Sequence, residues 1–266
     1  MEIVSSPIYP GSTFLARVRS SVPASGTLSF DDRAVPLFPG VEAGTQVALV
    51  GISVWTEAGQ HRVSVALRDE LGRATALSTT VEIVPADYPI DYVTLLPGRD
   101  ALLNPEIVQD EWAQIEPLLG EVSPQRLWEG AFISPTVGRI SSYFGAMRSY
   151  NGSPPSSYHS GLDISNITGT LVVAAARGRV MLAAALPVRG NSILLDHGWG
   201  VHSLYCHLSE ISVQEGEIVE QGQPIGRVGA TGLVSGAHLH WEMRIGLVPV
   251  NPVSYTHLTL PTIYSV

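Results

Sequence analysis

The sequence contains no lysine, and all fifteen of its basic residues are arginine. Every reaction that needs an ε-amine, such as Schiff-base catalysis, is therefore excluded. The single cysteine, Cys206, excludes an internal disulfide framework and says nothing about export from the cell. No apolar run of about 20 residues is present, so we expect no transmembrane segment in this chain.

Positive charge is also scarce. The 266 residues include 24 acidic and 15 basic side chains, which gives a formal net charge of −9. An excess of negative charge disfavours non-specific binding to nucleic acid, because phosphates are attracted to basic side chains. The length allows one large domain or two ordinary ones, and no pattern indicates the oligomeric state.

Residues 1–85 have the pattern of a small β-rich domain. Four short runs rich in β-branched residues are separated by turn residues: 13–19, 45–51, 61–67 and 78–84. Repeated short strands at this spacing predict a β-sandwich, and Gln60 to Gly72 resembles a strand and turn of bacterial Ig-like modules. Such a domain can be a binding module or a passive spacer, and the pattern leaves both open.

A linker with one helix is expected over residues 86–125. The pair Asn104-Pro105, followed by acidic residues, is typical of the start of a helix. We predict a helix over Glu106 to Leu119, with an apolar face that docks on one of the domains. The residues of this face are Ile107, Trp112, Ile115 and Leu118.

Two histidines, His238 and His240, flank Leu239 in a segment that suits a β-strand. Side chains two residues apart on a strand point to the same face. Both imidazoles should therefore face one cavity while Leu239 faces a core. A lone His-x-His is weak evidence of a site, because any histidine-rich strand can contain it.

A second pair of candidate site residues, His159 and Asp163, follows the loop-forming run Asn151 to Ser157. We expect His159 to begin an ordered segment at a loop exit, which is a common position for site residues. A further candidate, His207, lies in another strand-like segment. Adjacent strand residues point to opposite faces, so Cys206 and His207 are not expected to form a nucleophilic pair.

Together these clusters supply five side chains of the kinds that a catalytic zinc site needs: His159, Asp163, His207, His238 and His240. Catalytic zinc normally takes three protein ligands, drawn from His nitrogen and carboxylate oxygen, and keeps a fourth position for water. The two remaining histidines could then transfer protons. These residues alone do not say which three bind metal. The other histidines are expected to be ordinary surface or half-buried residues: His61, His197, His202 and His257.

The segment from residue 126 to residue 252 resembles the lysostaphin/LytM-type zinc endopeptidases of peptidase family M23. The landmarks of this resemblance occur in family order: Ile140–Gly145, Tyr158–Ile164, Tyr205–Ser209, Glu215–Gly226 and Gly229–Glu242. The resemblance implies an antiparallel β-sheet catalytic domain. Its segment Val213 to Gly226 also resembles the hairpin of lipoyl and biotinyl carrier domains, but a carrier needs a lysine, so we interpret the hairpin as scaffold.

The resemblance to family M23 also assigns roles. His159, Asp163 and His240 would bind one zinc ion (Zn²⁺) per chain, and His207 and His238 would be the catalytic pair. The implied reaction is hydrolysis of peptide stems or cross-links of bacterial peptidoglycan in the cell envelope, either periplasmic or extracellular. An alternative is a latent or non-catalytic activator or wall-binding protein, since the family contains members that have lost ligands. All five positions are present here, which favours the enzyme.

Both ends of the chain differ from what the resemblance implies. No charged and apolar signal sequence follows Met1, so we expect an upstream signal or anchor to be missing from this chain. Residues 253–266 resemble the translation of a sequencing-library adapter, and we expect them to be a non-native tail.

Overall fold

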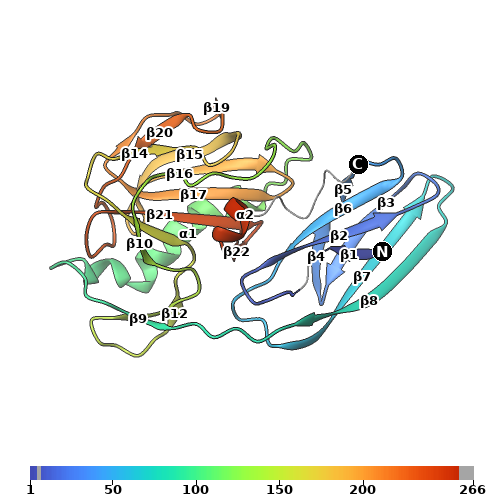
Figure 1. Cartoon of the computed structure of the whole chain (residues 1–266), viewed down its shortest axis with the longest axis horizontal. Coiled ribbons are helices and arrows are strands. Elements are labelled where there is room, and N and C mark those ends of the chain that lie inside the picture. Colours follow the sequence, from blue (N-terminus) through green and yellow to red (C-terminus); the bar gives the residue numbers. More distant parts are fainter. Residues whose placement is uncertain (5–6, 258–266) are drawn as a thin grey trace. The chain divides into compact units, whose positions relative to one another are not determined.

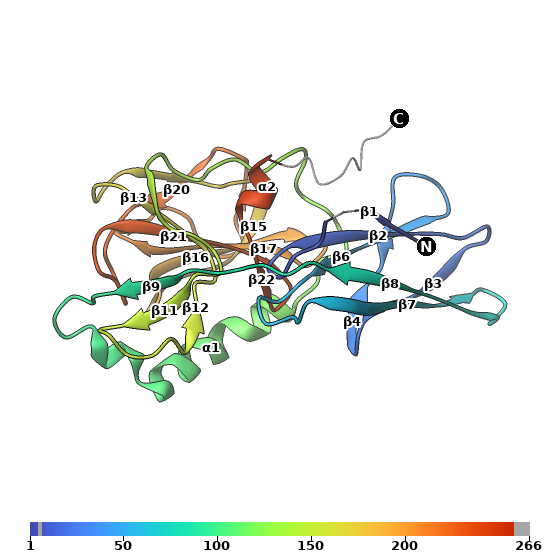
Figure 2. The same ribbon diagram turned by 60° about the horizontal axis from the view of Figure 1, so that its bottom comes forward.

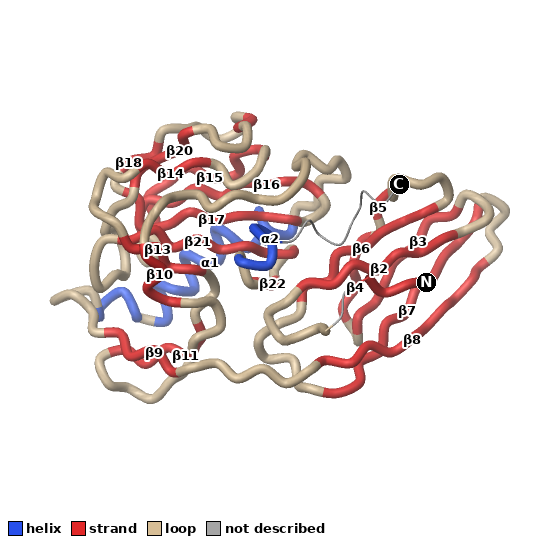
Figure 3. Tube along the Cα trace, in the orientation of Figure 1, coloured by secondary structure: helices blue, strands red, loops and turns tan. Residues whose placement is uncertain are grey.

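The structure, a computed structural model, describes residues 1–4 and 7–257. These residues form two compact units, Met1–Asp87 and Tyr88–His257. Strands dominate both units and helices are few, as Figure 3 shows, so the predicted mostly-β fold class is confirmed. None of the helices in the described ranges is long and apolar enough to cross a membrane.

Unit 1 consists of two four-stranded antiparallel sheets packed face to face. The first sheet has the order β1 (Glu2–Val4), β2 (Thr13–Arg19), β6 (Thr45–Gly51) and β5 (Phe38–Pro39). The second sheet has the order β4 (Arg33–Pro36), β3 (Ala24–Phe30), β7 (Gly59–Asp69) and β8 (Ala74–Ile83). Both sheets contribute apolar side chains to one core, such as Phe14 and Val50 from the first and Leu28 from the second. The two layers of the predicted sandwich are therefore present, and the likeness to Ig-like modules stays a prediction.

An eight-stranded antiparallel sheet forms the centre of unit 2 (Figure 1). Its order is β10 (Arg139–Ser142), β13 (Leu162–Ser165), β21 (His238–Ile245), β17 (Val201–Leu208), β16 (Gly190–Gly198), β15 (Gly178–Leu186) and β19 (Ile218–Val219), with β22 (Val248–Val250) paired to β21. Every residue of the central strand β17 is buried. Because both of its faces are covered, apolar and polar residues do not alternate strictly along this strand.

Two three-stranded sheets complete unit 2. One has the order β14 (Leu171–Val173), β20 (Pro224–Arg227) and β18 (Glu210–Ile211). The other has the order β12 (Ser157–Tyr158), β11 (Met147–Tyr150) and β9 (Ile90–Val93). Strand β9 pairs in parallel with β11. The beginning of the segment that we expected to be a linker is therefore part of the sheet structure of unit 2.

Helix α1 (Pro105–Gly120) begins where the sequence predicts, after the short 3-10 helix η1 (Asp100–Leu103). The side chain of Asn104 accepts a hydrogen bond from the backbone N–H of Glu106 at 2.8 Å. This bond satisfies one of the N–H groups that have no partner within the helix, and Pro105 has no N–H to satisfy. Local side-chain chemistry thus determines where the helix starts.

The buried face of α1 differs from the predicted one. Ile115 and Leu119 are fully buried in a cluster with leucines of β15, β16 and β17. In Figure 2 the helix runs below the strands of unit 2. Of the predicted face, only Ile115 is fully buried. Glu111, one turn before Ile115, is just 1% exposed. Residues 111, 115 and 119 are four positions apart and share one side of the helix, and the prediction missed this because Glu111 is charged.

Unit 2 ends with the short helix α2 (Val253–His257). Tyr255 in this helix is 1% exposed, and its ring lies edge-on to that of Phe132 with centroids 5.6 Å apart. The first residues of the segment that we expected to be a non-native tail are therefore packed in unit 2. The rest of that segment, residues 258–266, lies outside the described residues.

Candidate metal centre and active site

Strand pairing brings two of the candidate ligands together. Asp163 on β13 lies directly opposite His240 on the antiparallel neighbour β21. His238 and His240 line the same pocket, and Leu239 between them is fully buried. The alternation predicted from the sequence is thus confirmed, because both imidazoles face one cavity and the leucine faces a core.

His159 reaches the site from the loop that precedes β13. Two residues later, Gly161 passes close to β21: a Cβ atom at this position would lie 2.4 Å from the carbonyl oxygen of Trp241 and 2.9 Å from His240 Cε1. Only glycine permits this approach without moving a strand. The glycine between the two candidate ligands therefore allows His159 and Asp163 to pack against the same part of β21.

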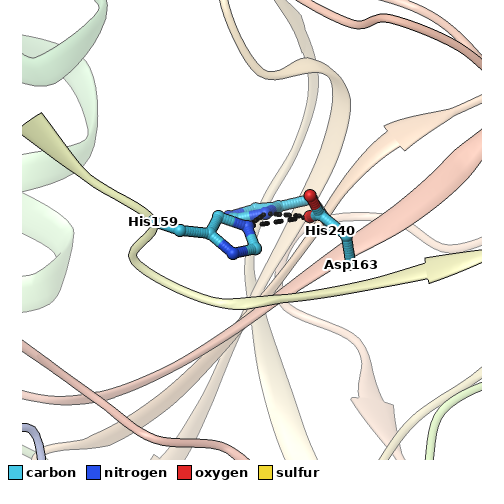
Figure 4. A group of neighbouring side chains, drawn as sticks. All are labelled: His159, Asp163 and His240. Carbon is cyan, nitrogen blue, oxygen red and sulfur yellow. Dashed lines mark hydrogen bonds and ion pairs between the residues drawn. The ribbon is translucent and has the colours of Figure 1, made fainter. Parts of the chain in front are cut away.

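Three candidate ligand atoms converge, as Figure 4 shows. His159 Nε2 lies 2.8 Å from Asp163 Oδ1 and 2.9 Å from His240 Nδ1. Asp163 Oδ1 and His240 Nδ1 are 2.8 Å apart. Two imidazole nitrogens and one carboxylate oxygen are a donor set of catalytic zinc sites, so these residues fit a zinc ion that keeps a fourth position for water.

The outward nitrogens of both candidate ligand histidines have hydrogen-bond acceptors. His159 Nδ1 lies 2.9 Å from the carbonyl oxygen of Tyr143, and His240 Nε2 lies 3.1 Å from Glu242 Oε1. A metal-binding imidazole needs its N–H on the outward nitrogen, so that the inward nitrogen can offer a lone pair. The surroundings of His159 and His240 favour this tautomer.

His207 and His238 border the same group of atoms. Their ring centroids are 4.9 Å apart, and His238 Nε2 lies 3.7 Å from Asp163 Oδ1. His207 Nδ1 lies 2.8 Å from the carbonyl oxygen of Thr231. His238 Nδ1 lies 2.9 Å from the carbonyl oxygen of Gly236. Since a carbonyl can only accept, each ring donates from Nδ1 when neutral and keeps a free lone pair on Nε2.

Arg148 orients the carboxylate of Asp163. Its Nη2 donates to Asp163 Oδ2 at 3.1 Å, and its Nη1 donates to Asp91 Oδ2 at 3.0 Å. Asp91 lies on β9 and also accepts a hydrogen bond from Ser142 Oγ at 2.6 Å. Because Arg148 occupies Oδ2, Asp163 turns its other oxygen toward the histidines.

Burial and close partners shift the pKa values of the site residues in opposite directions. Burial raises the pKa of Asp163, but the charges and hydrogen bonds of His159 and His240 outweigh it and hold this pKa well below its usual range. Burial lowers the pKa of His240, yet hydrogen bonds to Asp163 and Glu242 raise it to about 9. Binding of a metal ion at neutral pH would therefore displace a proton from His240.

An open pocket of about 340 Å³ is lined by all five predicted site residues, so the fold brings them together. A second pocket of about 200 Å³ also reaches Asp163 and His238. Both pockets share Val93, Arg148 and Ser235. The two pockets therefore adjoin each other at the candidate metal centre.

The remaining histidines lie elsewhere wherever their side chains are described. His61 forms an ion pair in unit 1. His197 and His202 are fully buried in the central sheet, so the surface or half-buried position expected for these two is wrong. The side chain of His257 lies outside the described part of the chain. Cys206 is fully buried in the core beneath α1, and burial raises the pKa of its thiol to about 12, so it carries no nucleophilic thiolate at neutral pH.

Comparison with known proteins assigns a family to this part of the chain. The model of peptidase family M23 matches residues 157–252, and all five predicted site residues lie in that range. Residues 157–252 belong to peptidase family M23. The resemblance noted from the motifs is thereby confirmed.

Several known proteins are similar to this chain. The DD-carboxypeptidase/endopeptidase Mpg of Neisseria meningitidis is 44% identical over 104 residues, which cover 39% of this chain and 23% of Mpg. The murein hydrolase activator NlpD of Salmonella dublin is 37% identical over 122 residues, which cover 46% of this chain and 30% of NlpD. The chain thus spans less than a third of the length of these curated relatives.

Among solved structures, an M23 peptidase candidate from Pseudomonas aeruginosa is similar to the chain with a TM-score of 0.69. The sequence identity is 26%, and the comparison covers 94% of this chain and 95% of that chain. The likeness therefore extends well beyond the M23 segment at residues 157–252.

Four charged residues around the candidate site were not predicted: Glu111, Arg148, Arg189 and Glu242. Glu242 lies two positions after His240 on β21, so the alternation rule that grouped His238 with His240 would also have found it. The other three come from segments that are distant in the sequence. No local pattern signals their contacts, because tertiary packing alone brings them to the site.

Proposed function

We propose that this chain is a zinc-dependent endopeptidase that hydrolyses peptide stems or cross-links of bacterial peptidoglycan. One observation supports this proposal most strongly: His159 Nε2, Asp163 Oδ1 and His240 Nδ1 converge beside two further histidines. Three metal donors and two proton-transfer groups in one pocket are what metal-assisted amide hydrolysis requires.

In this proposal His159, Asp163 and His240 hold one zinc ion per chain. A zinc ion bound there supplies Lewis acidity and lowers the pKa of a bound water toward neutrality. The protein keeps the inward nitrogens of both histidines available through the outward acceptors at Tyr143 and Glu242. These acceptors also fix the orientation of each ring.

His207 and His238 move protons in this proposal. Burial lowers the pKa of His238 and holds the pKa of His207 well below its usual range, so both imidazoles are neutral at neutral pH. A neutral Nε2 can accept a proton from the attacking water. The resulting N–H can then donate to the oxyanion or to the leaving amine.

The substrate class and the location are part of the same proposal. The M23 segment and its likeness to Mpg, which is named for carboxypeptidase and endopeptidase activity, and to NlpD, which is named for murein, support a peptide of the bacterial wall. Two pockets that meet at Asp163 and His238 can accept a chain on both sides of the cleaved bond. We place the activity in the cell envelope, periplasmic or extracellular, where peptidoglycan lies.

A non-catalytic activator of other wall hydrolases is a second candidate function. The similarity to NlpD, which is named as a murein hydrolase activator, favours it. The five candidate site residues, together in one pocket, favour the enzyme instead. The two functions differ in one observable, which is whether the protein itself cleaves peptide bonds.

Mass spectrometry of digested peptidoglycan tests the proposal. The full chain, loaded with zinc and analysed for metal content, would be incubated with purified peptidoglycan of several chemotypes beside a chelated sample. We expect new peptide ends that vanish with the chelator. No new ends from protein that contains one zinc per chain would overturn the endopeptidase, and stimulation of a separate wall hydrolase would then support the activator.

A further inference from the structure

We infer that helix α1 belongs to the catalytic machinery, with Glu111 as a positioning residue for both His207 and His240. The helix spans Pro105–Gly120 and lies outside the M23 segment at residues 157–252. The roles of the two histidines rest on the proposed function. The contacts of Glu111 are independent of that function.

Glu111 is a buried carboxylate whose two oxygens both have partners. Its Oε1 accepts a hydrogen bond from Arg189 Nη1 at 2.7 Å. Its Oε2 accepts from the backbone N–H groups of Val188 and Arg189. A charge that is only 1% exposed is costly unless it is paired and hydrogen-bonded in this way. All three donors lie in the turn between β15 and β16, so Glu111 fixes the conformation of that turn.

The turn held by Glu111 supports His207. The carbonyl oxygen of Arg189 accepts the backbone N–H of His207 at 2.9 Å. The carbonyl oxygen of Val188 accepts a backbone N–H from the 231–234 loop at 2.8 Å, and Thr231 in that loop fixes the His207 ring. His207 has a φ of +63°, a left-handed conformation that a non-glycine residue keeps only when its surroundings hold it. The turn and the loop are those surroundings.

The guanidinium of Arg189 connects Glu111 to His240. Its Nη2 lies 3.7 Å from Glu242 Oε1, which is the oxygen that faces His240 Nε2 at 3.1 Å. Glu111 holds the other terminal nitrogen of Arg189 and neutralises part of its charge. Without that carboxylate, Arg189 would turn toward Glu242 and compete with His240 for the same oxygen. The outward hydrogen bond that prepares His240 as a ligand would weaken.

The substitution Glu111→Gln tests the inference in the full chain. It keeps the size of the side chain but removes its charge and one of its acceptor oxygens. We expect kcat on peptidoglycan peptides to fall about 10- to 100-fold, with KM changed less than about twofold. The dissociation constant for zinc, measured by competition with a chelator, should rise about tenfold. The matched control is Glu116→Gln, an exposed glutamate on the same helix, which should change neither quantity.

A spectroscopic measurement separates positioning from a merely structural role. The side-chain ¹⁵N signals of His207 in zinc-loaded protein should report one tautomer in the wild type and a mixture in Glu111→Gln. A structural role alone would lower the melting temperature and leave these signals, the zinc affinity and kcat unchanged well below that temperature. That outcome would overturn the inference.

The test still works if the variant does not fold or if the wild type has no activity. If Glu111→Gln does not fold, Glu111→Asp keeps the charge but shortens the reach, and a smaller loss of zinc affinity is expected from it. If the wild type cleaves nothing, the proposed function fails. The zinc affinity and the His207 signals still decide whether Glu111 positions the two histidines.

Discussion

Arg148 Nη2 donates to Asp163 Oδ2 at 3.1 Å, which leaves Oδ1 as the oxygen that contacts both His159 and His240. An arginine that holds one carboxylate oxygen decides which oxygen remains for a metal and how the carboxylate is rotated. Through its second terminal nitrogen, Arg148 also holds Asp91 of β9. The candidate metal centre is thereby linked to a strand outside the M23 segment.

Replacement of Arg148 by methionine should weaken zinc binding. Arg148→Met keeps an apolar stem but removes both donors, so Asp163 can rotate and offer either oxygen. We expect the zinc dissociation constant to rise about 10- to 100-fold. Competition with a chromophoric chelator measures it, and Arg139→Met, at an exposed position of β10, is the control. Equal affinities of the two variants would show that Asp163 keeps its orientation without Arg148.

Alanine variants of the proposed zinc-binding histidines and of the proposed proton-transfer histidines should differ in their zinc content. His240→Ala removes a proposed ligand and is expected to lose both zinc and activity. His207→Ala removes a proposed proton-transfer group and is expected to keep zinc while activity falls about 10²- to 10⁴-fold. Metal analysis and peptidoglycan digestion are the measurements, with His61→Ala in unit 1 as the control. Activity retained by either site variant would contradict the role assigned to it.

Features that depend on neighbouring residues were predictable from the sequence. Strands β2 and β6 have the predicted bounds, and α1 starts at the predicted Asn104 cap. The grouping of His238 with His240 follows from the two-residue period of a strand. Each of these depends on backbone geometry over a few residues, which the local sequence specifies.

Features that depend on tertiary packing were not predictable. Glu111 looks like a solvent-facing helix residue, since most glutamates are exposed, and only the turn at Val188 explains its burial. The parallel pairing of β9 with β11 joins segments more than 50 residues apart, and no periodicity encodes the choice of a partner strand. The left-handed backbone of His207 is likewise set by contacts with distant turns and loops.

Replacement of Gly161 by alanine should disturb both stability and metal binding. The new Cβ would lie 2.4 Å from the backbone oxygen of Trp241, so β13 and β21 would have to move apart. We expect the free energy of unfolding to fall by about 1–3 kcal/mol and the zinc affinity to decrease, because Asp163 faces His240 across this strand pair. Gly120→Ala at the end of α1, where a Cβ meets nothing within 4 Å, is the control. Urea denaturation with the same midpoint in both variants would show that the strands can accommodate the methyl group.

The stability of unit 2 should decrease on acidification because of a histidine remote from the metal centre. His197 is fully buried; its Nδ1 lies 2.9 Å from the carbonyl oxygen of Arg177, and its Nε2 lies 2.7 Å from Ser203 Oγ. Burial lowers its pKa from 6.5 to about 4. Between these two values the unfolded chain binds a proton that the folded chain does not, so the free energy of unfolding decreases as the pH falls.

Within this window His197 should make the free energy of unfolding change by about 1.4 kcal/mol per pH unit, which amounts to about 3 kcal/mol in total. The contribution is fully present above pH 6.5 and is lost by about pH 4. Urea denaturation followed by tryptophan fluorescence at several pH values measures the slope. His197→Asn cannot titrate, so its slope of unfolding free energy against pH should be smaller by about one proton. Identical slopes in His197→Asn and the wild type would mean that His197 is protonated in the folded protein as readily as in the unfolded chain.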